Sequence, residues 1–116
     1  MGNKLPREKT HLLKSADFDA CYARGKKIHT KRFILFILKQ TYSPPLFGLT
    51  VSKKTGNAVK RNRIKRILRE FFRFNLKRLQ GFHIVAVAKR EACDLSLPDV
   101  EEELGAALKP YFSLEK

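Results

Sequence analysis

Residues 53–78 constrain the fold of this chain more than any other segment. This window carries eleven lysines and arginines and a single acid, Glu70. Apolar residues recur within it at helical spacing and share one face: Ile64, Ile67, Leu68 and Phe71. A helix with one apolar face has to bury that face against another layer. The spacing therefore predicts a helix over about 59–79 that packs on a sheet or on other helices.

The opposite face of this predicted helix is strongly basic. Its polar residues recur at i, i+4, i+7 and i+11, which are Asn62, Arg66, Arg69 and Arg73. A solvated helix face usually mixes charges into i,i+4 pairs, whereas like charges at that spacing repel each other. Arginine also presents a planar fork that suits phosphate oxygens. We therefore favour a nucleic-acid partner over a merely solvated face. A membrane-surface helix would need its apolar face for lipid, and the core takes that face.

The rest of the composition limits the class of protein. The chain has 116 residues, 43% of them hydrophobic, and a formal net charge of +14. This length predicts one domain, 1–116, with a polar N-terminal arm over 1–14. We find no apolar run of membrane-spanning length and no secretory signal, so we expect a cytoplasmic protein. Cys21 and Cys93 lack metal-ligand spacing and are expected to be reduced thiols.

Periodicity and breakers place the remaining elements. A short helix is expected from Ser15, as its N-cap, to Gly25 at its end. Thr55 and Asn57 are both candidate N-caps of the basic helix. Strands are expected at 32–39, 46–52 and 82–88, and a last helix at about 98–112. This order of elements predicts an α/β sandwich, a small sheet with helices on at least one face.

The sequence predicts no catalytic residues and no metal ligands. The acids of the C-terminal third, between residues 94 and 103, have spacing that favours capping of a helix over a two-metal site. His11, His29 and His83 have no motif partner, and strand alternation places His83 on a sheet surface. The chain also lacks a nucleophile elbow and a phosphate-binding loop. Aromatic residues near basic ones could stack on bases, with Phe18 and Tyr22 as the best candidates.

One stretch resembles a known family. Residues 52–66 read Ser-Lys-Lys-Thr-Gly-Asn-Ala-Val-Lys-Arg-Asn-Arg-Ile-Lys-Arg, followed by Leu68-Arg69-Glu70. This run is similar to the signature of the protein subunit of bacterial ribonuclease P. Weaker similarity lies at Asp17-Phe18, Tyr22, Gly25, Phe33 and 82–89. The resemblance extends over nearly the whole chain.

The resemblance implies a fold. It predicts an α+β, two-layer α/β sandwich with a mixed four-stranded sheet, similar to domain 2 of ribosomal protein S5. A short first strand is then expected at 27–29. The basic helix is expected in a left-handed crossover, against the usual right-handed preference.

The resemblance also implies a function and a set of contacts. The family's enzyme is an endoribonuclease that removes the 5′ leader of precursor tRNA, and its RNA subunit carries the metal-dependent catalysis. Residues expected at the catalytic RNA are Lys54, Asn57, Arg61, Asn62, Arg63, Lys65, Arg66, Arg69 and Arg73. Residues expected at the leader are Phe18, Tyr22, Phe36, Ser52, Lys53 and Lys89.

The implied partners are the RNA subunit and precursor tRNA, with no membrane. The protein is expected to be a monomer in a 1:1 ribonucleoprotein and to bind no cofactor itself, with Mg²⁺ ions held by the RNA. Two other hypotheses stay open at this point. One is a structural ribosomal protein. The other is a duplex DNA binder that reads the major groove with Arg66, Arg69 and Arg73.

Overall fold

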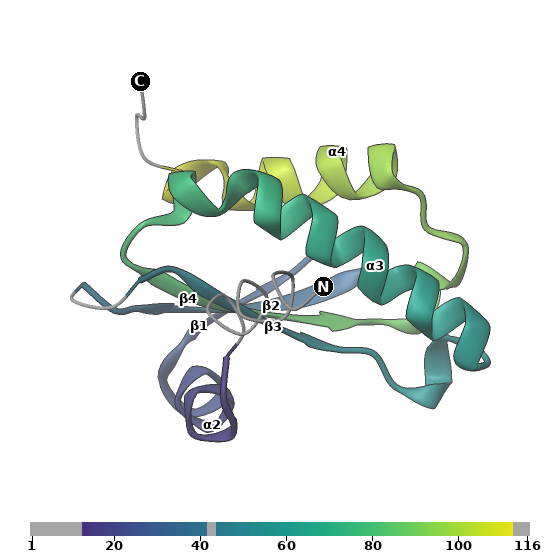
Figure 1. Ribbon diagram of the computed structural model, residues 1–116, viewed down its shortest axis with the longest axis horizontal. Coiled ribbons are helices and arrows are strands. Elements are labelled where there is room, and N and C mark those ends of the chain that lie inside the picture. The colour runs from purple at the N-terminus through teal and green to yellow at the C-terminus, as the bar shows by residue number, and fades with distance from the viewer. Residues whose placement is uncertain (1–12, 42–43, 113–116) are drawn as a thin grey trace, which may run out of the picture.

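A four-stranded sheet forms the middle of the molecule (Figure 1). The computed structural model describes residues 13–41 and 44–112, so most of the expected arm over 1–14 lies outside the described residues. The strands are β1 (Lys26–His29), β2 (Phe33–Lys39), β3 (Leu46–Thr50) and β4 (Phe82–Ala88). Their spatial order is β1-β2-β4-β3, with β3 parallel to β4 and the other pairs antiparallel. The expected mixed four-stranded sheet is confirmed, whereas the handedness of the β3–β4 crossover stays a prediction.

Helices lie on both faces of this sheet. The long helix α3 (Ala58–Asn75) and the helix α4 (Leu97–Leu108) lie side by side on one face. The short helix α2 (Ser15–Arg24) lies on the other face (Figure 1). The α3 and α4 side forms the two-layer sandwich that we expected, and α2 adds a partial third layer.

The apolar face of α3 packs on the sheet as its periodicity predicts. Ile64, Leu68 and Phe72 are fully buried there. The ring of Phe72 stacks on Phe47 of β3, with 5.1 Å between the ring centroids. The helix begins after Asn57, whose side chain accepts a hydrogen bond from the backbone N–H of Lys60. Of the two candidate N-caps, Asn57 is therefore the one used. The helix ends at Asn75, and a 3₁₀ turn over Leu76–Leu79 completes the expected segment.

Helix α4 is fixed at its start by a capping box. The hydroxyl of Ser96 accepts from the N–H of Asp99, and the Asp99 carboxylate accepts from the N–H of Ser96. These hydrogen bonds with Ser96 lower the pKa of the Asp99 carboxyl. The helix ends at Leu108 and is followed by a 3₁₀ turn over Lys109–Tyr111. The observed α-helix is therefore shorter than the predicted one, which extended to about residue 112.

The second face of the sheet has its own small core, which corrects the prediction for His83. Cys21 of α2 packs there with Leu38 and Val85. His83, expected on an exposed sheet surface, is only 4% exposed because α2 lies over this face. Burial lowers the pKa of His83, against the opposing effects of Asp17 and the Pro44 backbone.

Ser15 was predicted as the N-cap of α2 and is instead its first residue, with Lys14 at the N-cap position.

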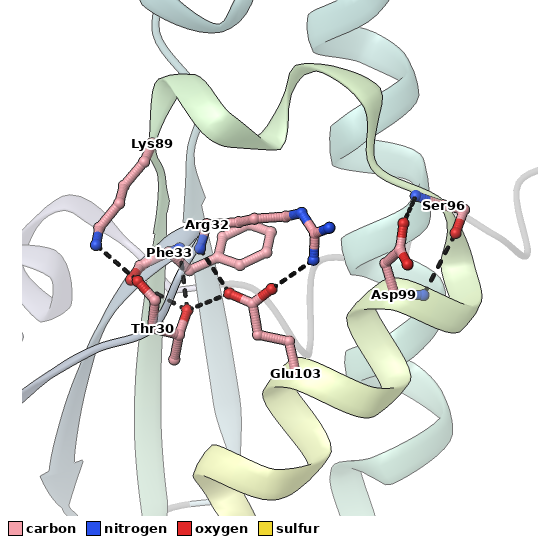
Figure 2. Close-up of polar contacts among 7 residues, drawn as sticks. All are labelled: Thr30, Arg32, Phe33, Lys89, Ser96, Asp99 and Glu103. Carbon is pink, nitrogen blue, oxygen red and sulfur yellow. Dashed lines mark hydrogen bonds and ion pairs between the residues drawn. The ribbon is translucent and has the colours of Figure 1, made fainter.

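A carboxylate on α4 fixes the turn between β1 and β2 (Figure 2). The Glu103 carboxylate accepts hydrogen bonds from the Thr30 hydroxyl and from the backbone N–H of Arg32. It also forms an ion pair with the Arg32 guanidinium at 2.8 Å. Burial raises the pKa of Glu103, but the hydrogen bonds from Thr30 and Arg32 outweigh burial, and the net shift is downward. This cluster therefore stabilises the fold in the ionised form of Glu103.

The Glu103→Gln variant should be less stable than the native chain by about 2 kcal/mol at pH 7, because Arg32 loses its charged partner. The folded-state pKa of Glu103 lies below its unfolded value of about 4.3. The stabilisation is therefore present above that value and is lost as the pH falls through the folded-state pKa. Urea unfolding between pH 7 and pH 3 measures this difference. The exposed neighbour Glu102 supplies the control Glu102→Gln, and equal losses in both variants would contradict the prediction.

Candidate nucleic-acid interface

The basic stripe of α3 faces away from the sheet. Asn62, Arg66 and Arg73 are exposed, and Arg69 is half-buried. All four line one open hollow along the helix, together with Lys65 and Glu70. Arg63 is exposed beside this stripe. The predicted geometry is confirmed, whereas the binding of RNA by these side chains stays a prediction.

Other residues predicted at the RNA have local structural roles. The side chain of Asn57 is engaged in capping α3. Arg61 is half-buried, because its position in the helix lies toward the apolar face. Its Nε atom is buried and has no hydrogen-bond partner among the described residues. A donor left in that state can donate a hydrogen bond to an anionic oxygen of a ligand.

The loop before α3 is held in one conformation by its own side chains. Ser52 caps a 3₁₀ turn over Lys53–Thr55, since its hydroxyl accepts from the N–H of Lys54. The buried hydroxyl of Thr55 donates to the Ser52 carbonyl at 2.8 Å. Gly56 follows with φ of 138°, a conformation that other residues rarely adopt. The loop thereby places the ammonium groups of Lys53 and Lys54, both exposed, beside the start of α3.

Aromatic rings form a second surface on the opposite face of the sheet. Tyr22 of α2 meets Phe36 of β2 edge to face, with 4.9 Å between ring centroids. Phe18 lies one turn earlier in α2, with its ring centroid 6.3 Å from that of Tyr22. Tyr22 is 41% exposed, so its ring is open to a ligand. Phe18, Tyr22 and Phe36, which we call the aromatic surface, are thus brought together as expected.

Three residues that complete this surface were missed by sequence reasoning. The hydroxyl of Thr50 lies 2.9 Å from that of Tyr22 and orients the ring. The ammonium of Lys27 lies 5.8 Å from the ring centroid of Phe36. A Cβ on Gly48 would overlap Cζ of Phe18, so the glycine lets that ring lie against β3. Glycine inside a strand is the one signal that could have indicated such a close approach.

Lys89, predicted at the leader, has an intramolecular partner. Its ammonium donates a hydrogen bond to the Thr30 carbonyl at 2.6 Å (Figure 2). Its backbone N–H donates to the Arg32 carbonyl. Lys89 therefore holds the end of β4 against the turn between β1 and β2, and its charge stays at that edge.

No three histidine, cysteine or acidic side chains among residues 13–41 and 44–112 lie close enough together to hold a metal ion. Burial raises the pKa of the Cys21 thiol to about 11, so it stays protonated at neutral pH. In the same part of the chain, no helix has the length and apolar character to cross a bilayer. The two surfaces present cations on α3 and aromatic rings beside α2.

The fold and the two surfaces define a small α+β domain that presents arginines on one side and aromatic rings on the other. A family model described as ribonuclease P matches residues 5–111. The chain belongs to this family, as the sequence resemblance indicated.

Relatives and solved structures agree with this assignment. The ribonuclease P protein component of Syntrophus aciditrophicus is 41% identical over 107 residues, and the match includes 90% of each chain. That of Maridesulfovibrio salexigens is 45% identical over 95 residues, 79% of this chain and 77% of the relative. The Staphylococcus aureus RNase P protein superposes with a TM-score of 0.79 at 30% identity, over 90% of this chain and 98% of that one. The Thermotoga maritima RNase P protein superposes with a TM-score of 0.76 at 28% identity, over 86% of this chain and 96% of that one.

Proposed function

We propose that this chain binds the RNA subunit of ribonuclease P through α3 and the 5′ leader of precursor tRNA through the aromatic surface. The observation that carries the proposal is the separation of two chemically different surfaces on opposite faces of one sheet. Arginines line the outward side of α3, and the rings of Phe18, Tyr22 and Phe36 gather on the far side. A protein that holds two RNA segments at once needs two such surfaces.

The stripe on α3 suits the backbone of a folded RNA. Its guanidinium groups are spaced along the helix and present positively charged donors. Contacts to phosphate are independent of sequence and set the position of the protein on the RNA. The stripe is therefore the surface for assembly with the RNA subunit.

The aromatic surface suits an unpaired strand. Bases in a duplex are stacked on each other, whereas unpaired bases are free to stack on protein rings. Tyr22 is exposed and held edge to face against Phe36, with its hydroxyl tied to Thr50. Its orientation is thus fixed before a ligand arrives, which reduces the entropic cost of binding.

In this proposal the RNA subunit and its Mg²⁺ ions perform the cleavage. The protein contributes affinity for the substrate and screens the charge between two RNA strands. It acts in the cytoplasm as a monomer in a 1:1 complex with the RNA. The product is the mature 5′ end of tRNA.

Reconstituted cleavage of precursor tRNA tests this proposal. We expect no cleavage by the protein alone, and cleavage at low Mg²⁺ concentration only when protein and RNA subunit are combined. Cleavage by RNA-free protein would overturn the proposal. The structural ribosomal alternative predicts co-sedimentation with ribosomal subunits and no effect on leader cleavage.

A further inference from the structure

Phe74 of α3 is the most exposed large apolar side chain in the part of the chain that the structure describes. Its side chain is 82% exposed, and neither of the two proposed RNA surfaces uses it. Each residue advances about 100° around a helix, so Phe74 points about 100° away from Arg73 of the stripe. A single exposed apolar side chain is ordinary on a protein surface, whereas one that borders a groove marks a contact site.

Phe74 borders such a groove, which runs between α3 and α4. Two hollows of about 190 and 310 Å³ form this groove. They share four lining residues, which are Phe71, Phe74 and Asn75 of α3 and Glu101 of α4. The α3 side of the groove extends from Glu70 to Arg78, about 12 Å along the helix. This length suits an elongated occupant that lies along the two helices.

The floor of the groove leaves no polar group of Asn75 unsatisfied. Phe71 and Asn75 are both buried there. The Asn75 amide donates to the Phe71 carbonyl at 2.9 Å and accepts from the Arg78 guanidinium at 3.1 Å. An apolar side chain that covers this floor therefore breaks no hydrogen bond and removes apolar surface from water.

A glycine opens the α4 side of the groove. Gly105 lies within α4 and lines the larger hollow, although glycine destabilises a helix relative to alanine. Its φ is not positive, and an added Cβ would meet no atom within 4 Å. Neither backbone conformation nor packing among the described residues thus requires glycine here. The absent side chain lets another backbone approach α4 closely, a contact that the described residues do not supply.

The rim of the groove is acidic, in contrast to the stripe. Glu70 and Glu101 are exposed and line the smaller hollow. Neither carboxylate forms an ion pair with another residue of 13–41 or 44–112. Glu102 beside them is also exposed, and α4 contains no lysine or arginine. Such a rim repels the phosphates of RNA and attracts lysines and arginines of a protein.

We propose that the groove between α3 and α4 binds a basic amphipathic helix of another protein. The apolar face of that helix packs on Phe74 and passes close to Gly105. Its lysines or arginines pair with Glu70 and Glu101. Helices bound in a groove contact it through residues at i, i+3, i+4 and i+7, and an aromatic ring is a common anchor. The contact uses neither the arginines of the stripe nor the aromatic surface.

Binding of two defined peptides to the full chain tests the proposal. The probe is a synthetic helix of about 14 residues, or about four turns, with leucines at i, i+3, i+4 and i+7 and lysines elsewhere. The control peptide has glutamates in place of the lysines. Because the chain carries a net charge of +14, non-specific attraction favours the acidic peptide. The proposal predicts the opposite at the groove.

Amide NMR locates the binding of each peptide. We expect the basic peptide to shift the amides of Phe74 and Gly105, and the acidic peptide to leave both unshifted. Shifts of these amides by the acidic peptide would overturn the proposal. The absence of a shift with either peptide would overturn it too.

Two variants and a matched control measure the contribution of the groove. Phe74→Ser removes the anchor and should weaken binding of the basic peptide by at least about 30-fold. Gly105→Leu fills the groove and should weaken binding as well, without lowering the urea midpoint, because leucine is the better helix former. Val59→Ser is the control, since Val59 is 76% exposed on α3 and lines neither hollow. Equal losses in Phe74→Ser and Val59→Ser would contradict the proposal.

Two further measurements distinguish the other occupants of the groove. Sedimentation of the free chain reports on a second copy, and binding of the RNA subunit to Phe74→Ser reports on RNA. We expect a monomer, and the same affinity for the RNA subunit in Phe74→Ser as in Val59→Ser. A native dimer that Phe74→Ser dissociates, or a specific loss of RNA affinity in Phe74→Ser, would overturn the proposal. None of these readouts depends on cleavage, so its failure and that of the proposed function are distinguishable.

Discussion

Replacing Arg63 and Arg66 together by alanine should reduce the salt dependence of RNA binding. Both side chains are exposed on α3. Each phosphate contact contributes about 0.7–0.9 to the slope of log affinity against log salt, so two contacts account for about 1.4–1.8. If the two curves converge near 1 M salt, the variant binds about 25- to 60-fold more weakly at 0.1 M. Filter binding of the RNA subunit across a salt series measures both quantities.

The matched control removes the same charge elsewhere. Lys39 at the end of β2 and Lys109 after α4 are exposed and lie outside both surfaces. The double variant Lys39→Ala/Lys109→Ala should keep the native slope. An unchanged slope in the Arg63/Arg66 variant would contradict the prediction and indicate that the stripe is only a solvated helix face. Equal reductions in both variants would indicate a general charge effect.

Replacing Tyr22 by alanine should weaken the binding of precursor tRNA and leave the binding of mature tRNA unchanged. Stacking of one base on an aromatic ring contributes about 1–3 kcal/mol, which corresponds to about 5- to 150-fold in affinity. Tyr22 is the most exposed ring of the aromatic surface and has the Phe36 ring behind it. Binding of both tRNA forms to the holoenzyme, measured in parallel, gives the ratio.

Two conservative variants separate the ring of Tyr22 from its hydroxyl. Tyr22→Phe keeps the ring and loses the hydrogen bond with Thr50, and Thr50→Val removes the same bond from the other side. Both should change precursor affinity by less than about threefold, the effect of one exposed hydrogen bond. If Tyr22→Ala weakens the binding of precursor and mature tRNA equally, Tyr22 does not contact the leader and the prediction is wrong.

The charged helix could be predicted from sequence because its information is local. A period of 3.6 residues assigns every residue of α3 to a face, and Asn57 is a strong N-cap type. The stripe followed directly, since Asn62, Arg66 and Arg73 lie opposite Ile64 and Leu68. Arg61 was the exception, because it is charged but half-buried on the sheet side.

The aromatic surface and the burial of His83 depend on packing between distant segments. Alternation along β4 shows that His83 and Ile84 face opposite ways, but it does not show that both faces are buried. Only the position of α2 against β2 and β4 decides that. The contacts of Thr50 with Tyr22 and of Lys27 with Phe36 likewise join elements that sequence spacing does not relate. The resemblance to the family, rather than periodicity, supplied Phe18, Tyr22 and Phe36 as a set.

The strand order has a consequence for the chain as the ribosome synthesises it. β4 lies between β2 and β3, so β3 has no strand partner until residue 88 has been made. Helix α3 precedes β4 along the chain and is therefore synthesised before the sheet on which it packs is complete. Until then its buried face is open and its positive charges repel one another. The basic helix is thus synthesised before the last strand of the sheet that supports it.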